Sequence, residues 1–166
     1  MVNSKKIITN QKNIDMVTEQ QVKKYHQRLN ENIKKTGYQL TYVSSSDSPD
    51  FCYSTGIYQT FHSPELFISS LPRGLCYEIV KNYVDVFLDN QGIQLNKRLD
   101  LLTDRFPVYL IDVPVPNLKE YVLSSFSFYG NEHFEYLQVV YPDTKGNFPD
   151  SADYDYDQVI LGKFKS

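Results

Sequence analysis

Residues that can do chemistry gather in one segment of the chain, DFCYSTGIYQTFHSPELFISSLP, which spans residues 50–72. Within fourteen positions it contains Cys52, Ser54, His62, Ser63 and Glu65. A thiol or hydroxyl beside an imidazole and a carboxylate can act as a nucleophile, because the imidazole accepts its proton. However, the segment has no lysine or arginine that would lower the pKa of Cys52. It also has no G-x-S-x-G turn. The residue types therefore suit catalysis, but their spacing matches no nucleophile motif.

Motifs for metals and cofactors are equally weak. A structural zinc site needs four ligands and a catalytic one three, usually with short spacings between them. The candidate ligands are instead scattered along the chain: His26, Cys52, His62, Cys76 and His133. The sequence contains neither G-x-G-x-x-G nor G-x-x-x-x-G-K-[ST], the glycine-rich motifs that hold phosphate groups. We therefore expect no metal and no cofactor.

An acidic, tyrosine-rich stretch lies near the C-terminus and reads Asp153-Tyr154-Asp155-Tyr156-Asp157. A calcium-binding EF-hand loop starting at Asp153 would need glycine at its sixth position and glutamate at its twelfth. Those positions hold Gln158 and Phe164, so this calcium motif is rejected. Two interpretations remain open: a solvated loop, or a surface whose carboxylates and tyrosine rings contact a basic partner protein.

The net charge of −3 is divided unevenly along the 166 residues. Residues 1–36 contain eight Lys or Arg and three acidic residues, whereas the rest of the chain contains nine and seventeen. A protein that binds nucleic acid would be expected to carry a basic stripe on its main body. We therefore expect no nucleic acid as a ligand, and the acidic main body favours a basic protein as partner.

No apolar run approaches the roughly 20 residues that span a bilayer. The N-terminal residues also lack the apolar core of a signal peptide. The expected location is the cytoplasm, without membrane association. In that compartment Cys52 and Cys76 are expected to stay reduced and buried.

The hydrophobic pattern predicts a single α+β domain over residues 14–166, preceded by a flexible leader over residues 1–13. A helix is expected from Thr18 to just before Gly37 and another after Pro72, with a third over 118–128. Strands are expected at 38–43, 51–57, 66–71, 98–103, 106–113 and 134–141, with a short one at 158–162. Two or three helices then flank a mainly antiparallel sheet.

Two separated motifs carry a resemblance to a known family. F-x-Y-S-x-G-I, P-E-L and L-P in residues 51–72 are followed by L-Q-V-V-Y-P-D-T-K-G-N-F-P in residues 137–149. This resembles a widespread bacterial family of small uncharacterised domains, a domain of unknown function, whose motifs are F-x-Y-T-x-G-L, G-H-P-E-L, G-L-P and L-Q-x-x-W-P-D-x-x-G-x-F-P. The resemblance covers about residues 28–162. Its motif residues here are Tyr53, Gly56, Pro64, Glu65, Pro142, Asp143, Gly146 and Phe148.

The chain departs from the family pattern at three positions. Ser63 stands where the family usually has histidine, His62 where it has glycine, and Tyr141 where it has tryptophan. If the family has an active histidine, this member has moved or lost it. Gly56 is expected to allow a bend where its strand ends. Glu65 is expected either to accept backbone N–H groups at the turn or to face a pocket.

These observations favour a non-catalytic protein-binding domain whose partner-binding residues are Asp153 to Asp157. An immunity- or antitoxin-like role, in which this surface blocks a basic toxin or enzyme, fits the size and charge. The alternative is a small hydrolase or small-molecule-modifying enzyme with a pocket around Tyr53, His62, Glu65 and Asp143. In that case His62, Glu65 and Asp143 would be its catalytic residues.

Overall fold

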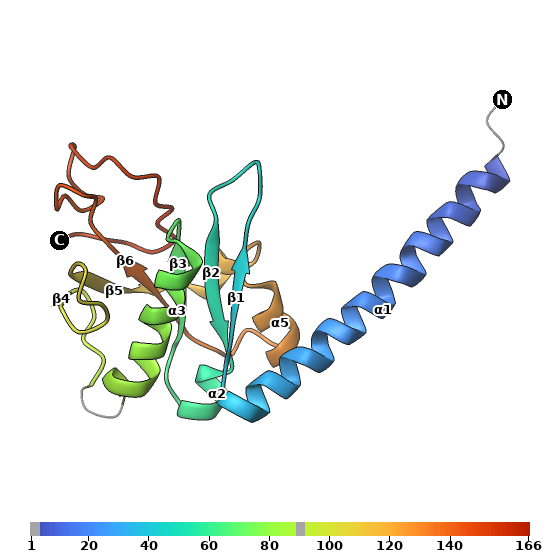
Figure 1. Cartoon of the computed structure of the whole chain (residues 1–166), viewed down its shortest axis with the longest axis horizontal. Coiled ribbons are helices and arrows are strands. Elements are labelled where there is room, and N and C mark those ends of the chain that lie inside the picture. The colour runs from blue at the N-terminus through green and yellow to red at the C-terminus, as the bar shows by residue number, and fades with distance from the viewer. Residues whose placement is uncertain (1–3, 89–91) are drawn as a thin grey trace.

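A six-stranded sheet forms the centre of the protein in a computed structural model, which describes residues 4–88 and 92–166 (Figure 1). Its strand order is β1-β2-β3-β6-β5-β4. Neighbouring strands are antiparallel except β3 and β6, which are parallel. The strands are β1 (Gln39–Val43), β2 (Phe51–Thr55), β3 (Glu65–Ser69), β4 (Arg98–Leu99), β5 (Val108–Val113) and β6 (Tyr136–Val140). The predicted α+β class with a mainly antiparallel sheet is confirmed.

Helices cover both faces of this sheet. They are α1 (Ser4–Thr36), α2 (Ile57–Phe61), α3 (Arg73–Asn82) with the π-helical segment η1 (Tyr83–Phe87), the 3₁₀ segment η2 (Val115–Leu118) and α5 (Leu123–Tyr129). Strand β3 shows how the two faces are built, because successive side chains point in opposite directions. Leu66 and Ile68 pack with Ile79 of α3, whereas Phe67 packs with Leu118 of η2 on the other face.

Helix α1 is longer than the sequence pattern predicted. It begins at Ser4 instead of Thr18, so residues 4–13 of the expected leader are helical. No glycine or proline interrupts residues 4–36, which explains why the helix continues through Thr18. It ends as expected before Gly37, whose φ of 91° suits glycine. In Figure 1 the N-terminal half of α1 projects away from the sheet.

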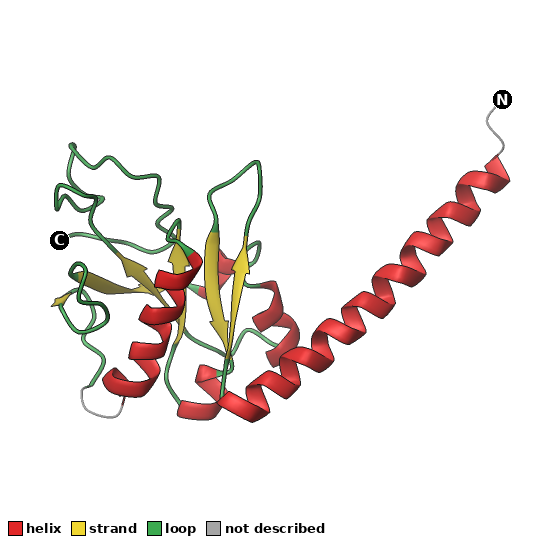
Figure 2. Cartoon of the chain, in the orientation of Figure 1, coloured by secondary structure: helices red, strands yellow, loops and turns green. Residues whose placement is uncertain are grey.

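The C-terminal segment also differs from its prediction. Residues 141–166 follow β6 without a helix or strand, and residues 158–162 are not a strand (Figure 2). Its first part forms backbone turns, and its later part bonds to side chains of the sheet. The Gln138 side chain donates to the Val159 carbonyl at 2.6 Å and accepts from the Leu161 N–H at 2.8 Å. Ser69 Oγ accepts from the Val159 N–H at 3.0 Å.

Although α1 has 33 residues, its polar composition sets it apart from a membrane span. Neither α1 nor any other helix in the described ranges is long and apolar enough to cross a bilayer.

Candidate functional site

The Glu65 carboxylate lies completely buried at the start of β3, where it organises the chain around α2. Its oxygens accept hydrogen bonds from Ser54 Oγ at 2.6 Å, from the N–H groups of Gly56, Ile57 and Tyr58 at 2.7, 3.2 and 3.2 Å, and from the Tyr129 hydroxyl. The first N–H groups of a helix have no partner within the helix. Glu65 therefore caps α2 from the following strand, which is one of the two roles expected for it.

The electrostatics of Glu65 reflect two opposing effects. Burial raises the pKa of this carboxyl, and the hydrogen bonds from Ser54, Tyr129 and the backbone of α2 counteract that rise. The side chain has no exposed surface, and protein donors surround its oxygens. Glu65 is therefore placed to hold the backbone, and it is not placed to exchange a proton with a molecule from solvent.

The three residues of the enzyme alternative do not meet at one site. His62 is exposed in the turn before β3, with a φ of 54°. Glu65 pairs with Tyr136 at the start of β6, and Asp143 lies seven residues later, beyond the opposite end of that strand. At about 3.3 Å per residue, this separation is roughly 20 Å along the sheet. Glu65 and Asp143 thus belong to different ends of the sheet.

Tyr53, the fourth residue of that alternative, belongs to a hydrogen-bond network on the face of the sheet that η2 and α5 cover. Its hydroxyl donates to Ser124 Oγ at 2.8 Å and accepts from the Ser124 N–H at 3.1 Å. The hydroxyl of Tyr25 in α1 contacts the same Ser124 Oγ at 2.5 Å. Tyr53 therefore links β2 to α5 and, through Ser124, to α1. Pro64 lies outside this network, and its carbonyl accepts a hydrogen bond from the Tyr83 hydroxyl at 2.9 Å.

Asp143 organises the turn that follows β6. Its carboxylate accepts hydrogen bonds from the N–H groups of Lys145 and Asn147, both at 2.9 Å, and of Asp155 at 3.1 Å. Burial on its own would raise the pKa of Asp143, but these N–H donors lower it below its ordinary value. Gly146 has a φ of 86° in this turn. The family block around Pro142 is therefore a backbone scaffold that also holds the acidic segment.

The predicted partner-binding residues lie on a surface loop, which we call the acidic tyrosine loop (residues 153–157). Asp153, Asp155, Tyr156 and Asp157 are exposed, and Tyr154 is half-buried. Tyr156 packs against the rings of Tyr141 and Tyr154, with centroid distances of 6.3 and 6.1 Å. The loop therefore presents acidic side chains beside an aromatic ring.

The two cysteines are buried and free. Burial raises the pKa of the Cys52 thiol, and the neighbouring Cys76 raises it further. A thiol held in its protonated form is a poor nucleophile, so the geometry gives no support to a Cys52–His62 pair. Within residues 4–88 and 92–166, no three His, Cys, Asp or Glu side chains are arranged to hold a metal ion.

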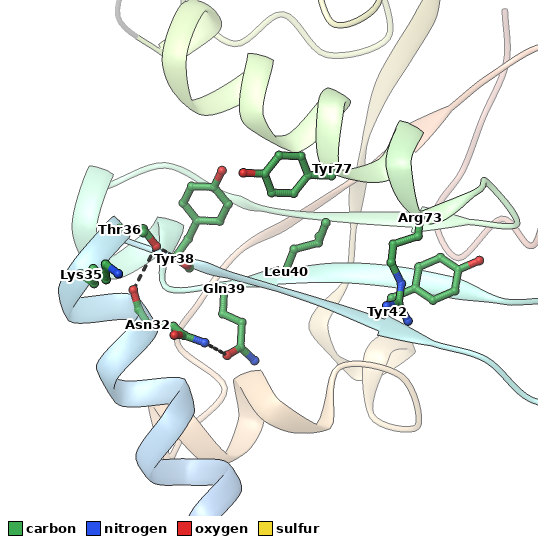
Figure 3. Close-up of a pocket in the computed structure, with 9 residues that line it drawn as sticks. All are labelled: Asn32, Lys35, Thr36, Tyr38, Gln39, Leu40, Tyr42, Arg73 and Tyr77. Carbon is green, nitrogen blue, oxygen red and sulfur yellow. Dashed lines mark hydrogen bonds between the residues drawn. The ribbon is translucent and has the colours of Figure 1, made fainter.

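A groove that the sequence pattern did not reveal lies between β1 and α3, and we call it the β1–α3 groove (Figure 3). Its volume is about 520 Å³. It is lined by Asn32, Lys35 and Thr36 of α1, by Tyr38 just before β1, by Gln39, Leu40 and Tyr42 of β1, and by Arg73 and Tyr77 of α3. The sequence offered one usable signal, since Arg73 and Tyr77 are four residues apart and share a helix face. Their alignment with β1 arises only from the tertiary fold.

Residues 32–155 match the family DUF4262, a domain of unknown function. No curated protein and no solved structure matched the chain. The match contains the Glu65 cap, the Asp143 turn and part of the acidic tyrosine loop, and it leaves out most of α1. The protein is therefore a member of the DUF4262 family.

Proposed function

We propose that this protein is a non-catalytic binding domain whose acidic tyrosine loop contacts a basic partner protein. The observation that carries the proposal is the fixed backbone of this exposed loop. The Asp155 N–H donates to Asp143, and Ser70 Oγ donates to the Asp157 carbonyl at 2.6 Å. A loop that is ordered before binding loses less conformational entropy when a partner docks.

Tyrosine adds contact area to this charged surface. Tyr156 is 44% exposed, so part of its ring is available to a partner while its neighbours hold it in place. Burial raises the pKa of Tyr154 to about 12, so its hydroxyl stays neutral beside the carboxylates at physiological pH. Tyrosines are enriched among the residues that contribute most to protein–protein binding.

The charge of the main body indicates what kind of partner fits. Acidic residues outnumber basic ones by eight in residues 37–166, which favours encounter with a basic surface. An immunity- or antitoxin-like protein that covers the basic cleft of a toxin or enzyme would use such a surface. The enzyme alternative has less support, because Glu65 and Asp143 hold backbone groups at different ends of the sheet.

The test combines identification of a partner with charge reversal in the loop. The full chain is used to capture a partner from its host, and the captured protein is identified, purified and titrated calorimetrically. Asp155→Lys with Asp157→Lys should weaken binding by about thirtyfold or more, since two attractions become repulsions. Affinity should also fall as salt is added.

The control is Asp47→Lys with Asp104→Lys, which makes the same change in net charge on two other exposed loops. This variant should keep most of the affinity. If the loop variant binds the purified partner as tightly as the unmodified protein, the acidic tyrosine loop is not the interface.

A further inference from the structure

The outer edge of the sheet at β1 is open for a second interaction. β1 is the last strand on its side of the sheet, and within the described residues only β2 pairs with it. Such an edge presents backbone N–H and C=O groups that can pair with an added strand. The β1–α3 groove lies beside this edge, so side chains of an added strand would have a place to enter.

The side chains of the groove follow the period of a strand. Tyr38, Leu40 and Tyr42 lie on the side of β1 that faces α3, while Gln39 points the other way toward Asn32, whose side chain donates to it at 2.8 Å (Figure 3). In an added strand, alternate side chains would lie opposite these three positions. The central position is apolar, because Leu40 occupies the middle of the groove.

Each end of the groove has a cation. Lys35 lies near the Tyr38 end, and the Arg73 guanidinium lies 5.0 Å from the centre of the Tyr42 ring (Figure 3). The Tyr42 hydroxyl donates to Asp50 at 3.0 Å, which fixes the ring on which Arg73 stacks. The distance from residue 38 to residue 42 is about 13 Å in a strand. Two acidic side chains four residues apart in an extended peptide span the same distance.

These cations are free to meet an incoming anion. Among the residues that the structure describes, no carboxylate oxygen is paired with Lys35 or Arg73. Burial, Tyr77 and Asp85 raise the pKa of Tyr38 at one end of the groove. Asp85 itself is paired with Lys81. Asp50 and Asp157 lie on the other side of Tyr42, in a separate hollow of about 380 Å³.

We propose that the β1–α3 groove binds an extended acidic peptide segment of a partner protein, which adds to the edge of β1. The segment has acidic residues at its first and fifth positions, which face Lys35 and Arg73, and an apolar residue at its third, which faces Leu40. This pattern is the same in both chain directions, so it fits a parallel or an antiparallel addition. Main-chain pairing provides affinity and the alternate side chains provide selectivity.

The probe is a nine-residue peptide with blocked ends, glutamate at its third and seventh residues and valine at its fifth. Fluorescence anisotropy of the labelled peptide with the full chain should show saturable binding that weakens with salt. Arg73→Gln and Lys35→Gln should each weaken binding by roughly fivefold, the size expected for partly exposed ion pairs. Arg98→Gln on β4, at the opposite edge of the sheet, and Lys145→Gln are the matched controls and should bind as the unmodified chain does.

A second pair of probes tests the strand pairing itself. Successive N–H groups of a strand point to opposite sides, so N-methylation at the fifth or at the sixth residue blocks opposite edges of the peptide. One of the two methylated peptides should lose binding, and the other should retain it. Equal binding of both would show recognition without edge pairing and would overturn the proposal.

Three further outcomes would also overturn it: no binding of the parent peptide, equal binding by the Arg73→Gln chain, or equal binding of a peptide with glutamines in place of both glutamates. A dimer of the free chain that Arg73→Gln dissociates would identify a second copy as the occupant and would equally contradict a partner peptide. Asp155→Lys with Asp157→Lys should leave peptide binding intact. The proposal for the groove and the proposal for the acidic tyrosine loop can therefore be contradicted independently.

Discussion

At the scale of single residues, Glu65 combines two properties that rarely occur together, complete burial and an ionisable group. The carboxylate is retained because Ser54, Tyr129 and the backbone N–H groups at the start of α2 donate to it. Removing a buried acceptor leaves such donors unsatisfied, which costs more than the net value of the bonds themselves. The structural role of Glu65 thus accounts for an acid that belongs to the family motif.

We expect Glu65→Gln to lower the free energy of unfolding by about 2–4 kcal/mol, because the amide NH₂ would face groups that also donate. Urea denaturation followed by circular dichroism measures this loss. Glu135→Gln is the control, since Glu135 is exposed just before β6 and its change should stay within about 0.5 kcal/mol. Equal stability of the Glu65→Gln and unmodified chains would contradict the capping role.

Residue roles were predictable only in part. The sequence placed Glu65 and Gly56 in one motif and left two roles open for Glu65, accepting backbone N–H groups or facing a pocket; the structure shows the first. It did not indicate that Tyr129, 64 positions away, would share this carboxylate. It also gave no sign that Asp143 bonds to the backbone of Asp155. Such contacts depend on the order of strands in the sheet, which local patterns do not determine.

At the scale of elements, the end of α1 packs against α2, with Gly37 after α1 and Gly56 before α2 at the contact. Gly56 has a φ of 109°, and a Cβ atom there would lie 2.9 Å from the Gly37 carbonyl oxygen and 3.0 Å from Ile33 Cγ1. The close approach of α1 to the β2–α2 connection therefore requires glycine. The sequence predicted a bend at Gly56, but it did not predict the short helix that follows.

Gly56→Ala should destabilise the fold by about 2 kcal/mol or more, because a side chain at this φ is strained and has no space. Gly74→Ala is the matched control in α3, where a Cβ atom would meet nothing within 4 Å. Helix propensity predicts a gain of about 0.5–1 kcal/mol for this control. Thermal unfolding of both variants tests the pair, and a stable Gly56→Ala chain would contradict the packing argument.

Helices and strands with a periodic hydrophobic pattern were predicted correctly. The prediction failed for a segment whose conformation depends on the distant residues to which it bonds. The helix after Pro72 and the strands around residues 39–43, 51–55 and 108–113 were predicted from periodicity. The segment 158–162 has a strand-like composition, but it lies on a face of the sheet and bonds to Gln138 and Ser69. It therefore cannot form a ladder, although its composition would allow one.

At the scale of the whole molecule, the charges are segregated between α1 and the rest. The basic residues of α1 lie on a helix whose N-terminal half projects from the sheet, while the remainder is acidic (Figure 1). Contacts near the other end of α1 attach it to the body. Leu29 and Ile33 are buried, Tyr25 contacts Ser124, and His26 Nε2 lies 3.1 Å from Ser127 Oγ. The body therefore depends on the second half of α1.

Two truncations test this division of α1. A chain without residues 1–18 should keep a melting temperature within about 2 °C of the full chain, because it retains the attachment through Tyr25, Leu29 and Ile33. A chain without residues 1–30 loses the Leu29 side chain, which is 2% exposed, and the Tyr25–Ser124 contact. Its free energy of unfolding should fall by about 3 kcal/mol or more. Differential scanning calorimetry compares the three chains, and equal losses in both truncations would show that the projecting half of α1 also supports the fold.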